Sequence, residues 1–500
     1  MTQQNRLSER LVTLKNKSLP LDPDAAIRAE IGHLVDSYVE EYLSDVDTAP
    51  AFIGEDEASN VLESSSSGVP IQTLPGFVED GMGLAATLSL LKTEVDRPGI
   101  ATTSPRFFGY IPGGGLYYSA VADLLASVTN KYAGVYFASP GAVRVEDQCL
   151  DFLAELVGYG AGYGGYLSSG GSLANFTAVV AARDFYRVEG PKIAQSVIYL
   201  TDHAHHCIDK AVHLAGLSTC IVRRIPVDNR YRMRTDLLEN QLEEDKNAGL
   251  IPFFVVATAG TTNTGSVDPL EAIGQLAARY GAWYHIDGAY GALFALCDEG
   301  KEMLKGMEWS DSIVMDPHKT LFLPYGIGAL LVKDKNRLLA SHAVGADYMQ
   351  DVIHVEATSP ATVSPELTKH FRGLRMWLPL QVVGVAPFRS ALAEKMLLAR
   401  HFHSKLSRVE GFEVGPEPDL SVVTYRFIPK FEDPDLFNER LVQAIHKDGR
   451  IFVSSTRLNG VFMLRLAVVC FRSHQTDVDT ALQVLDELAH ALDNASFSTE

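Results

Sequence analysis

The sequence predicts an α/β fold with a mostly parallel sheet, preceded by a helical arm and followed by a small α+β domain. Between residues 100 and 335, short apolar runs alternate with segments of helical spacing, which is typical of a parallel sheet with helices on both faces. With 500 residues, the chain exceeds the size of one simple core. We therefore expect an N-terminal arm and linker at 1–98, a large domain at 99–384 and a small domain at 385–500.

The arm is predicted to contain a helix over residues 20–45, because Ile27, Ile31 and Leu34 recur there at helical spacing. Residues 55–75 follow as a polar, turn-rich segment and are expected to form a linker. An arm of this kind can pack on a partner subunit. The alternative is that it covers the core of its own chain.

The large domain contains five apolar runs that we expect to form strands, separated by helices such as residues 172–186 and 270–280. Two further apolar runs lie on either side of Lys319. Because ligands of parallel sheets bind beyond the carboxyl ends of the strands, residues that directly follow a strand are the candidates for a site. The five runs are residues 165–167, 196–200, 220–222, 252–257 and 283–286.

The small domain is predicted from a different order of elements. A long helix over residues 385–406 leads into it. Strands are then expected to flank two helices, which indicates an α+β unit. The strands are residues 421–427, 449–455 and 461–469, and the helices are residues 435–447 and 477–492.

The composition excludes several classes of protein. The formal net charge of −19 argues against a nucleic-acid surface, which needs clustered Lys and Arg. The five cysteines lie far apart without a CxxC pair, as expected for reduced thiols in the cytoplasm rather than disulfides or a zinc site. Because the N-terminus is polar, we expect no signal peptide. The sequence contains no uncharged apolar run of about 18 residues, so we also expect no membrane-spanning helix.

Two polar loops follow predicted strands. Residues 168–175 open a helix, and there Gly171 and Ser172 would let backbone N–H groups approach an anion. The pattern is neither GxGxxG nor a P-loop, and an ordinary glycine-rich turn is the alternative. Residues 258–265, which include Thr262, suit a loop around a polar ligand, although a simple turn explains them equally well.

Four histidines lie within eleven residues after another strand. Their spacing is not HExxH, and no carboxylate or cysteine completes a tetrahedral set, so we predict no metal site. His205, close to the strand end, could lie over a flat ring or transfer a proton. His206 and His213 are expected to be surface residues.

Lys319 and Asp287 carry the strongest chemical indication. Each is placed at the end of a buried apolar run, where a charged group is costly unless it has a partner. A cofactor with an aldehyde and a basic ring nitrogen, pyridoxal 5′-phosphate, would satisfy both. Ala289, two residues after Asp287, would leave room for the ring. The alternatives are a surface lysine and an ordinary turn carboxylate.

Taken together and in this order, these positions resemble the pyridoxal phosphate-dependent group II decarboxylases, which act on aromatic amino acids, glutamate or diaminobutyrate. The resemblance runs from about residue 20 to 490. It implies the aspartate aminotransferase-like fold, known as fold type I, with a seven-stranded, mostly parallel sheet. It also implies site roles: a Schiff-base lysine (Lys319) preceded by His318, a ring-nitrogen partner (Asp287), a ring contact (Ala289), a stacking imidazole (His205) and groups for the cofactor's polar atoms (Gly171, Ser172, Thr262).

The chain departs from the family pattern in two places. Asp316 stands where the family usually has Asn, three positions before the lysine. The stretch 351–365 lacks the loop tyrosine with which aromatic decarboxylases protonate the substrate carbon, and Tyr348 or His354 could substitute for it.

The segment 104–112 resembles the entry to the family's substrate pocket. Its aromatic residues predict an aromatic substrate through Phe108 and Tyr110, together with Tyr136. Such a cluster is also common in protein cores, which is the alternative.

We therefore expect an L-amino acid decarboxylase that releases CO2 and an amine, in a homodimer with the arm and residues 345–365 at the interface. Decarboxylation coupled to oxidative deamination, which gives an aldehyde, is the first alternative, because a carbon that is not promptly protonated can react with oxygen. Another carbon–carbon lyase is a second. A catalytically silent scaffold of the same fold is the alternative outside enzymes.

Overall fold

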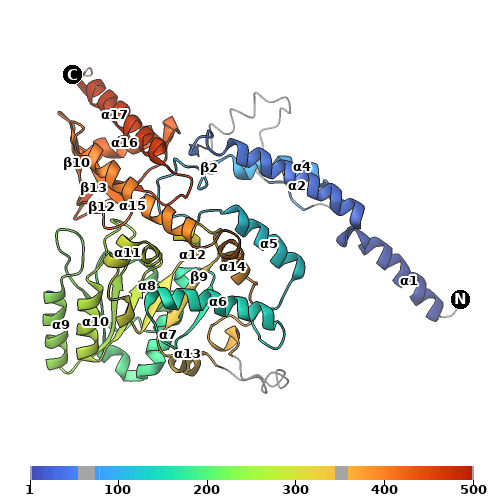
Figure 1. Ribbon diagram of the computed structural model, residues 1–500, viewed down its shortest axis with the longest axis horizontal. Helices are drawn as coiled ribbons and strands as arrows, with labels where there is room; N and C mark the ends of the chain where they lie inside the picture. Colours follow the sequence, from blue (N-terminus) through green and yellow to red (C-terminus); the bar gives the residue numbers. More distant parts are fainter. Residues whose placement is uncertain (1–2, 55–73, 78, 344–357, 498–500) are drawn as a thin grey trace. The chain divides into compact units, whose positions relative to one another are not determined.

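Figure 1 shows a computed structural model of the protein, which describes residues 3–54, 74–77, 79–343 and 358–497. The chain divides into two compact units, Met1–Ser104 and Pro105–Glu500. The finer boundaries expected at residues 98 and 384 stay predictions.

The first unit is built from helices and one short strand pair. Helix α2 (Ala25–Asp45) begins where Asp24 accepts the N–H groups of Ala26 and Ile27, a typical N-cap. This agrees with the predicted helix, whereas α1 (Gln3–Ser18) was not predicted. The other elements are η1 (Leu19–Leu21), α4 (Leu84–Leu91), η2 (Lys92–Asp96) and the antiparallel pair β1 (Phe52–Ile53) and β2 (Gly99–Ile100).

The second unit contains the expected seven-stranded sheet, in the order β3-β9-β8-β7-β6-β4-β5. Strand β9 runs antiparallel to both of its neighbours, and all other neighbouring strands are parallel. The mostly parallel sheet is thus confirmed. The strands are β3 (Gly164–Ser168), β4 (Ser196–Leu200), β5 (Ile221–Arg224), β6 (Ile251–Thr258), β7 (Trp283–Asp287), β8 (Ser312–Met315) and β9 (Gly328–Val332).

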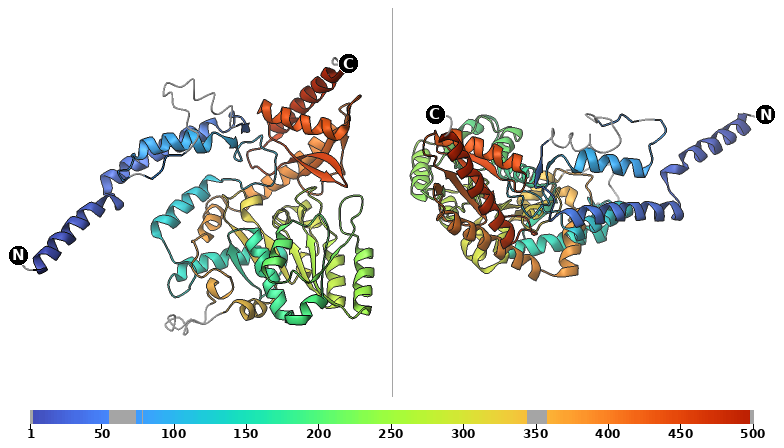
Figure 2. Two further views of the ribbon diagram at one scale, coloured as in Figure 1. Left: turned by 180° about the vertical axis from the view of Figure 1, so that it is seen from behind. Right: turned by 90° about the horizontal axis from the view of Figure 1, so that it is seen from above.

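Helices cover both faces of this sheet, as the turned views show (Figure 2). Their apolar side chains form two separate cores. Apolar side chains of α7 (Gly171–Tyr186), α8 (Cys207–Leu214) and α13 (Lys335–His342) pack on one face. Those of α6 (Pro140–Val157), α9 (Thr235–Asn247) and α10 (Leu270–Tyr280) pack on the other. The other α-helices described in this part are α5 (Tyr117–Thr129), α11 (Asp298–Met303), α12 (Pro317–Thr320) and α14 (Gly373–Val383).

A second sheet, with the order β10-β11-β13-β12, is antiparallel and has its own core. The strand predicted at 449–455 is present, but its bounds are wrong, because it runs from Ser454 to Leu458. Gly449 takes a left-handed conformation with φ 74° and ends the preceding helix, so the strand starts later, at Ser454. The elements are β10 (Phe412–Val414), β11 (Val422–Phe427), β12 (Ser454–Leu458), β13 (Val461–Ala467), α15 (Ala386–Leu406), α16 (Pro434–Asp448) and α17 (Gln475–Phe497).

None of the helices in the described parts of the chain is both long and apolar enough to cross a membrane.

Candidate active site

The ends of the central strands surround a cavity of about 410 Å³, a size common for small-molecule sites. It lies where parallel-sheet proteins bind their ligands. All eight residues predicted to contact a cofactor line this cavity: Gly171, Ser172, His205, Thr262, Asp287, Ala289, His318 and Lys319.

Lys319 lies in the short helix α12, directly after β8. Its Nζ is 3.3 Å from Oδ2 of Asp316, and its side chain is 23% exposed, so the amine reaches the cavity while staying partly enclosed. The adjacent Thr320 fixes the helix by donating a hydrogen bond to the Tyr290 carbonyl at 3.1 Å. The alternative of a surface lysine therefore does not describe this residue.

Asp287 ends β7 on the cavity wall and is 5% exposed. Its Oδ1 accepts the N–H of Ala289 at 3.2 Å, and its Oδ2 accepts Nδ2 of Asn175 at 3.4 Å. The Asn175 side chain is oriented in turn by His285, whose Nε2 lies 2.7 Å from Asn175 Oδ1. The carboxylate is thus held in place and can still accept a proton donor from the cavity.

His205 and His318 present neutral imidazoles to the cavity. Burial lowers the pKa of both rings below its usual value. His318 Nδ1 donates to the Ile327 carbonyl at 2.6 Å, and His205 Nδ1 accepts the N–H of Cys207 at 3.2 Å. His206 and His213 are exposed, as expected.

The start of α7 forms a glycine cradle. Gly170, with φ 155°, precedes the helix and provides no side-chain cap, so the first N–H groups of α7 remain available to an anion. A Cβ atom on Gly171 would lie 3.2 Å from Cβ of Ala289 and 2.9 Å from Oδ2 of Asp316. Any larger residue at this position would therefore clash with Asp316 and crowd Ala289.

The loop that carries Thr262 is anchored by a buried arginine of the antiparallel sheet. Arg465 Nε donates to the Asn263 carbonyl at 2.9 Å, and its Nη2 donates to the Thr262 carbonyl. Burial lowers the pKa of this guanidinium to about 10. Sequence reasoning gave no signal for this contact, because the two segments are about 200 residues apart.

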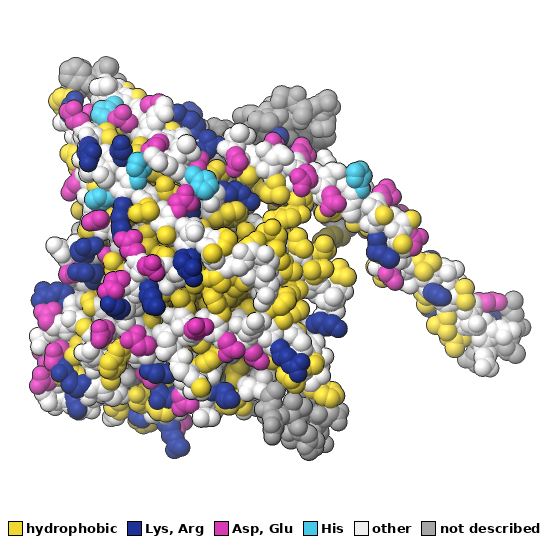
Figure 3. Space-filling view, in the orientation of Figure 1, with side chains coloured by type: hydrophobic (Ala, Val, Ile, Leu, Met, Phe, Trp, Pro, Cys, Tyr) yellow, Lys and Arg dark blue, Asp and Glu magenta, His cyan; other side chains and the backbone are white. Residues whose placement is uncertain are grey.

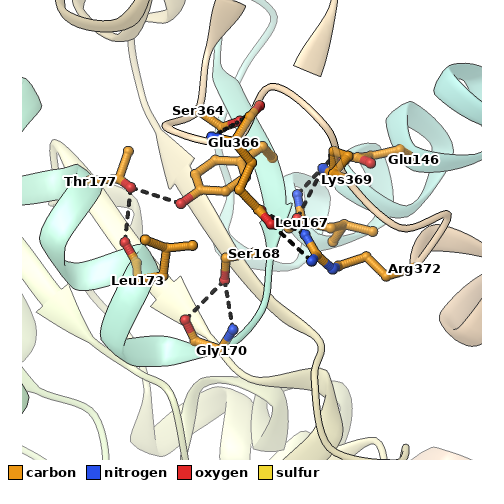
Figure 4. Close-up of polar contacts among 11 residues, drawn as sticks. Glu146, Leu167, Ser168, Gly170, Leu173, Thr177, Ser364, Glu366, Lys369 and Arg372 are labelled. Carbon is orange, nitrogen blue, oxygen red and sulfur yellow. Dashed lines mark hydrogen bonds and ion pairs between the residues drawn. The ribbon is translucent and has the colours of Figure 1, made fainter. Parts of the chain in front are cut away.

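A buried ion pair fixes the strand that leads into the glycine cradle (Figure 4). Lys369 Nζ lies 2.6 Å from Oε1 of Glu146, which also accepts the N–H of Leu167 at 2.9 Å. The carbonyl of Leu167 accepts Lys369 Nζ and Nη1 of Arg372, each at 3.0 Å. Both backbone groups of this residue are therefore held by charged side chains, one position before Ser168.

The predicted substrate residues do not gather at this cavity. Phe108 is fully buried in the core of the antiparallel sheet, against side chains such as Phe402, so it is corrected from a substrate residue to a core residue. Tyr110 and Tyr136 are absent from the cavity walls formed by the described residues, and their substrate role stays a prediction. Tyr348 and His354 lie outside the described residues.

The cavity also contains residues that sequence reasoning missed. Tyr325 follows Lys319 by six positions, and its ring centroid is 5.8 Å from that of His318. Tyr290 and Cys207 line other parts of the wall. The position of Tyr325 between Lys319 and a strand could have marked it, whereas Cys207 reads only as an apolar helix residue.

These groups fit pyridoxal 5′-phosphate. The amine of Lys319 matches the aldehyde, the carboxylate of Asp287 matches the ring nitrogen, and the open start of α7 matches the phosphate. The cavity is therefore that of a pyridoxal phosphate-dependent enzyme of the aspartate aminotransferase-like fold.

The chain belongs to the pyridoxal-dependent decarboxylase family, because the model of the pyridoxal-dependent decarboxylase conserved domain matches residues 92–428. It is thus a pyridoxal phosphate-dependent carboxy-lyase of amino acid metabolism.

Several known proteins are similar over most of their length. An aromatic-L-amino-acid decarboxylase of Bacillus atrophaeus is 33% identical over 400 residues, which cover 79% of this chain and 82% of the relative. A phenylacetaldehyde synthase of Arabidopsis thaliana is 27% identical, covering 93% of this chain and 96% of the relative. The crystal structure of Oryza sativa TDC with PLP and tryptamine superposes with a TM-score of 0.84 at 26% identity, covering 94% of this chain and 99% of that one.

Proposed function

We propose that the protein decarboxylates an aromatic L-amino acid at Cα and releases CO2 and the amine. The main observation in support of this proposal is that one cavity brings Lys319, Asp287 and His205 together beside the glycine cradle. The aromatic preference is supported by the names of relatives, which include aromatic-L-amino-acid, tyrosine and tryptophan decarboxylases. Two aromatic side chains on the cavity wall, Tyr290 and Tyr325, agree with it.

The residue roles are part of this proposal. Pyridoxal phosphate, when bound, supplies an electron-accepting ring and an aldehyde that reacts with amines. Lys319 provides the amine that holds the aldehyde carbon, and Asp287 keeps the ring nitrogen protonated. His205 would contact the ring as a neutral imidazole. Gly171 and Ser172 hold the phosphate through their N–H groups, and Thr262 and His318 contact other polar atoms.

The test is a product screen. The purified protein, loaded with pyridoxal phosphate, is incubated with each common L-amino acid, and CO2 and amine are quantified. We expect Tyr, Trp, Phe or dihydroxyphenylalanine to give the largest kcat/KM. Preference for glutamate or diaminobutyrate would contradict the aromatic assignment but leave the decarboxylase assignment intact.

A second candidate product is an aldehyde. Phenylacetaldehyde synthases are among the relatives, and the stretch 351–365 contains no tyrosine. The same incubations therefore include an oxygen electrode and ammonia detection. Consumption of one O2 and release of one NH3 per CO2 would show that the protein catalyses oxidative deamination instead of forming the amine.

We also propose a homodimer and a cytoplasmic location. The five cysteines are buried and unbridged, which suits a reducing compartment. The dimer is supported by the apolar surface of α5, seen in the space-filling view (Figure 3). On this helix Leu124 is 64% and Val128 76% exposed, and apolar patches of this kind mark association surfaces.

Replacing Leu124 and Val128 together by Asp is expected to convert the dimer to a monomer, because two charges would be buried at the interface. Sedimentation analysis measures the change. Leu397→Asp, at an equally exposed leucine on α15, is the matched control and should leave the dimer intact. If the unaltered protein sediments as a monomer, the dimer proposal is wrong.

A further inference from the structure

Asp316 is a buried carboxylate that the proposed roles do not use. It is 2% exposed, and its Oδ1 has no hydrogen-bond partner among the described residues. Its Oδ2 faces Lys319 Nζ at 3.3 Å and His318 Nε2 at 3.7 Å. An unpartnered buried carboxylate oxygen is unfavourable, so this group is expected to gain a partner when the cavity is filled.

Oδ2 of Asp316 lies beside the glycine cradle, and its Oδ1 lies beside Gly328 of β9, which is next to Gly170. A Cβ atom on Gly171 would be 2.9 Å from Oδ2, and one on Gly328 would be 2.5 Å from Oδ1. The start of α7 attracts an anion, whereas an ionised Asp316 beside it repels one. If the phosphate binds at this cradle, as proposed above, the two negative charges meet within the same small space.

The neighbouring histidine favours a protonated carboxyl group. Nδ1 of His318 donates to the Ile327 carbonyl, which can only accept, so the neutral ring turns the lone pair of Nε2 toward Asp316. When a phosphate is bound at the cradle, an ionised Asp316 would therefore face a hydrogen-bond acceptor on one side and an anion on another. Only Lys319 offers it a positive charge at close range within the described structure.

We propose that Asp316 takes a proton when the phosphorylated cofactor binds, so that its carboxyl group donates a hydrogen bond at the cradle instead of repelling the phosphate. The proton comes from the ammonium group of Lys319, which must lose it before its lone pair can attack the aldehyde. The exchange is balanced: Lys319 becomes a neutral amine, Asp316 becomes a neutral acid, and the later condensation releases one water.

The other titratable groups at this wall do not supply the proton. Burial lowers the pKa of His318 and His205, and it raises the pKa of the Cys207 thiol, so that all three are neutral near pH 7. The carboxylate of Asp287 accepts hydrogen bonds from Asn175 and Ala289. Farther away, Arg375 is paired with Asp123 at 2.9 Å.

The experiment compares cofactor binding by the unaltered apoprotein and by Asp316→Asn. Calorimetric titrations with pyridoxal 5′-phosphate in buffers of different ionisation enthalpy give the number of protons exchanged. On binding pyridoxal phosphate, the unaltered protein is expected to take up about one proton more than the variant. The Kd of the unaltered protein for pyridoxal phosphate, divided by that of the variant, should therefore increase by up to about tenfold for each unit by which the pH is raised. Asp298→Asn, an exposed position on α11, is the control and should match the unaltered protein.

Pyridoxal, which lacks the phosphate, provides a second measurement. At about pH 8 the phosphate is fully ionised, so the proton difference between the two proteins should appear with pyridoxal phosphate and vanish with pyridoxal. Equal proton numbers in both proteins, or weaker binding by Asp316→Asn at every pH, would overturn the inference while leaving the cofactor assignment standing. An unaltered protein that bound no pyridoxal phosphate would overturn both.

Discussion

Lys319→Ala is expected to lower amine formation by at least about 10³-fold, because this variant removes the amine that reacts with the cofactor aldehyde. Lys319 is the lysine on the cavity wall, and its Nζ lies 3.3 Å from Asp316. CO2 release and amine formation under saturating cofactor measure the effect. Lys301→Ala, an exposed lysine on α11, is the matched control and should retain full activity.

A second readout separates loss of chemistry from loss of binding. Since the cradle and Asp287 remain in Lys319→Ala, the variant should still take up pyridoxal phosphate, but reduction with borohydride should no longer attach the cofactor covalently. Lys319→Arg keeps a positive charge beside Asp316 and should be equally inactive, because a guanidinium does not lose its proton at neutral pH. Normal turnover by either variant would refute the proposed role of Lys319.

The grouping of the candidate cofactor-binding residues around one cavity was predictable because the polar side chains directly follow the strands. Asp287 and Lys319 come directly after apolar runs, and the carboxyl ends of parallel strands meet at one edge of a sheet. The aromatic residues of the cavity wall were not predictable in the same way. A buried core aromatic such as Phe108 and a cavity residue such as Tyr325 look alike in sequence, and only long-range packing separates them.

The start of one strand and the contacts that anchor the cavity walls were also not predictable from the sequence. The predicted strand starts at Gly449, yet the left-handed conformation of this glycine ends a helix. The contacts that hold the strand before the cradle and the loop of Thr262 join positions more than 200 residues apart, as in Lys369 with Glu146 and Arg465 with Thr262. No local sequence pattern indicates that such residues form a pair.

Lys369→Met is expected to lower the free energy of unfolding by about 3–5 kcal/mol, because it leaves the carboxylate of Glu146 buried without its cation. The Lys369 side chain is fully buried, and that of Glu146 is 2% exposed. Burial already lowers the pKa of Lys369, which shows that the ammonium is held there against the cost of desolvation. Urea unfolding of the cofactor-free protein measures the change.

Two comparisons make this result specific to the buried pair. Lys305→Met breaks an ion pair with Glu302 whose partners are 65% and 70% exposed, and it should change stability by less than about 1 kcal/mol. Glu146→Gln combined with Lys369→Met removes both charges and should recover part of the loss, since Gln can still accept the N–H of Leu167. Equal stability of Lys369→Met and Lys305→Met would show that the pair does not hold the fold.

The same variant tests whether the ion pair positions the cofactor. Leu167 is fixed by Glu146 through its N–H and by Lys369 through its carbonyl, and Ser168 next to it bonds both backbone groups of Gly170. Loss of Lys369 should therefore weaken pyridoxal phosphate binding under conditions where the protein is still folded, while Lys305→Met should not. If the folded Lys369→Met protein binds the cofactor as tightly as the unaltered protein, the pair stabilises the fold alone, because the cradle then keeps its shape without this support.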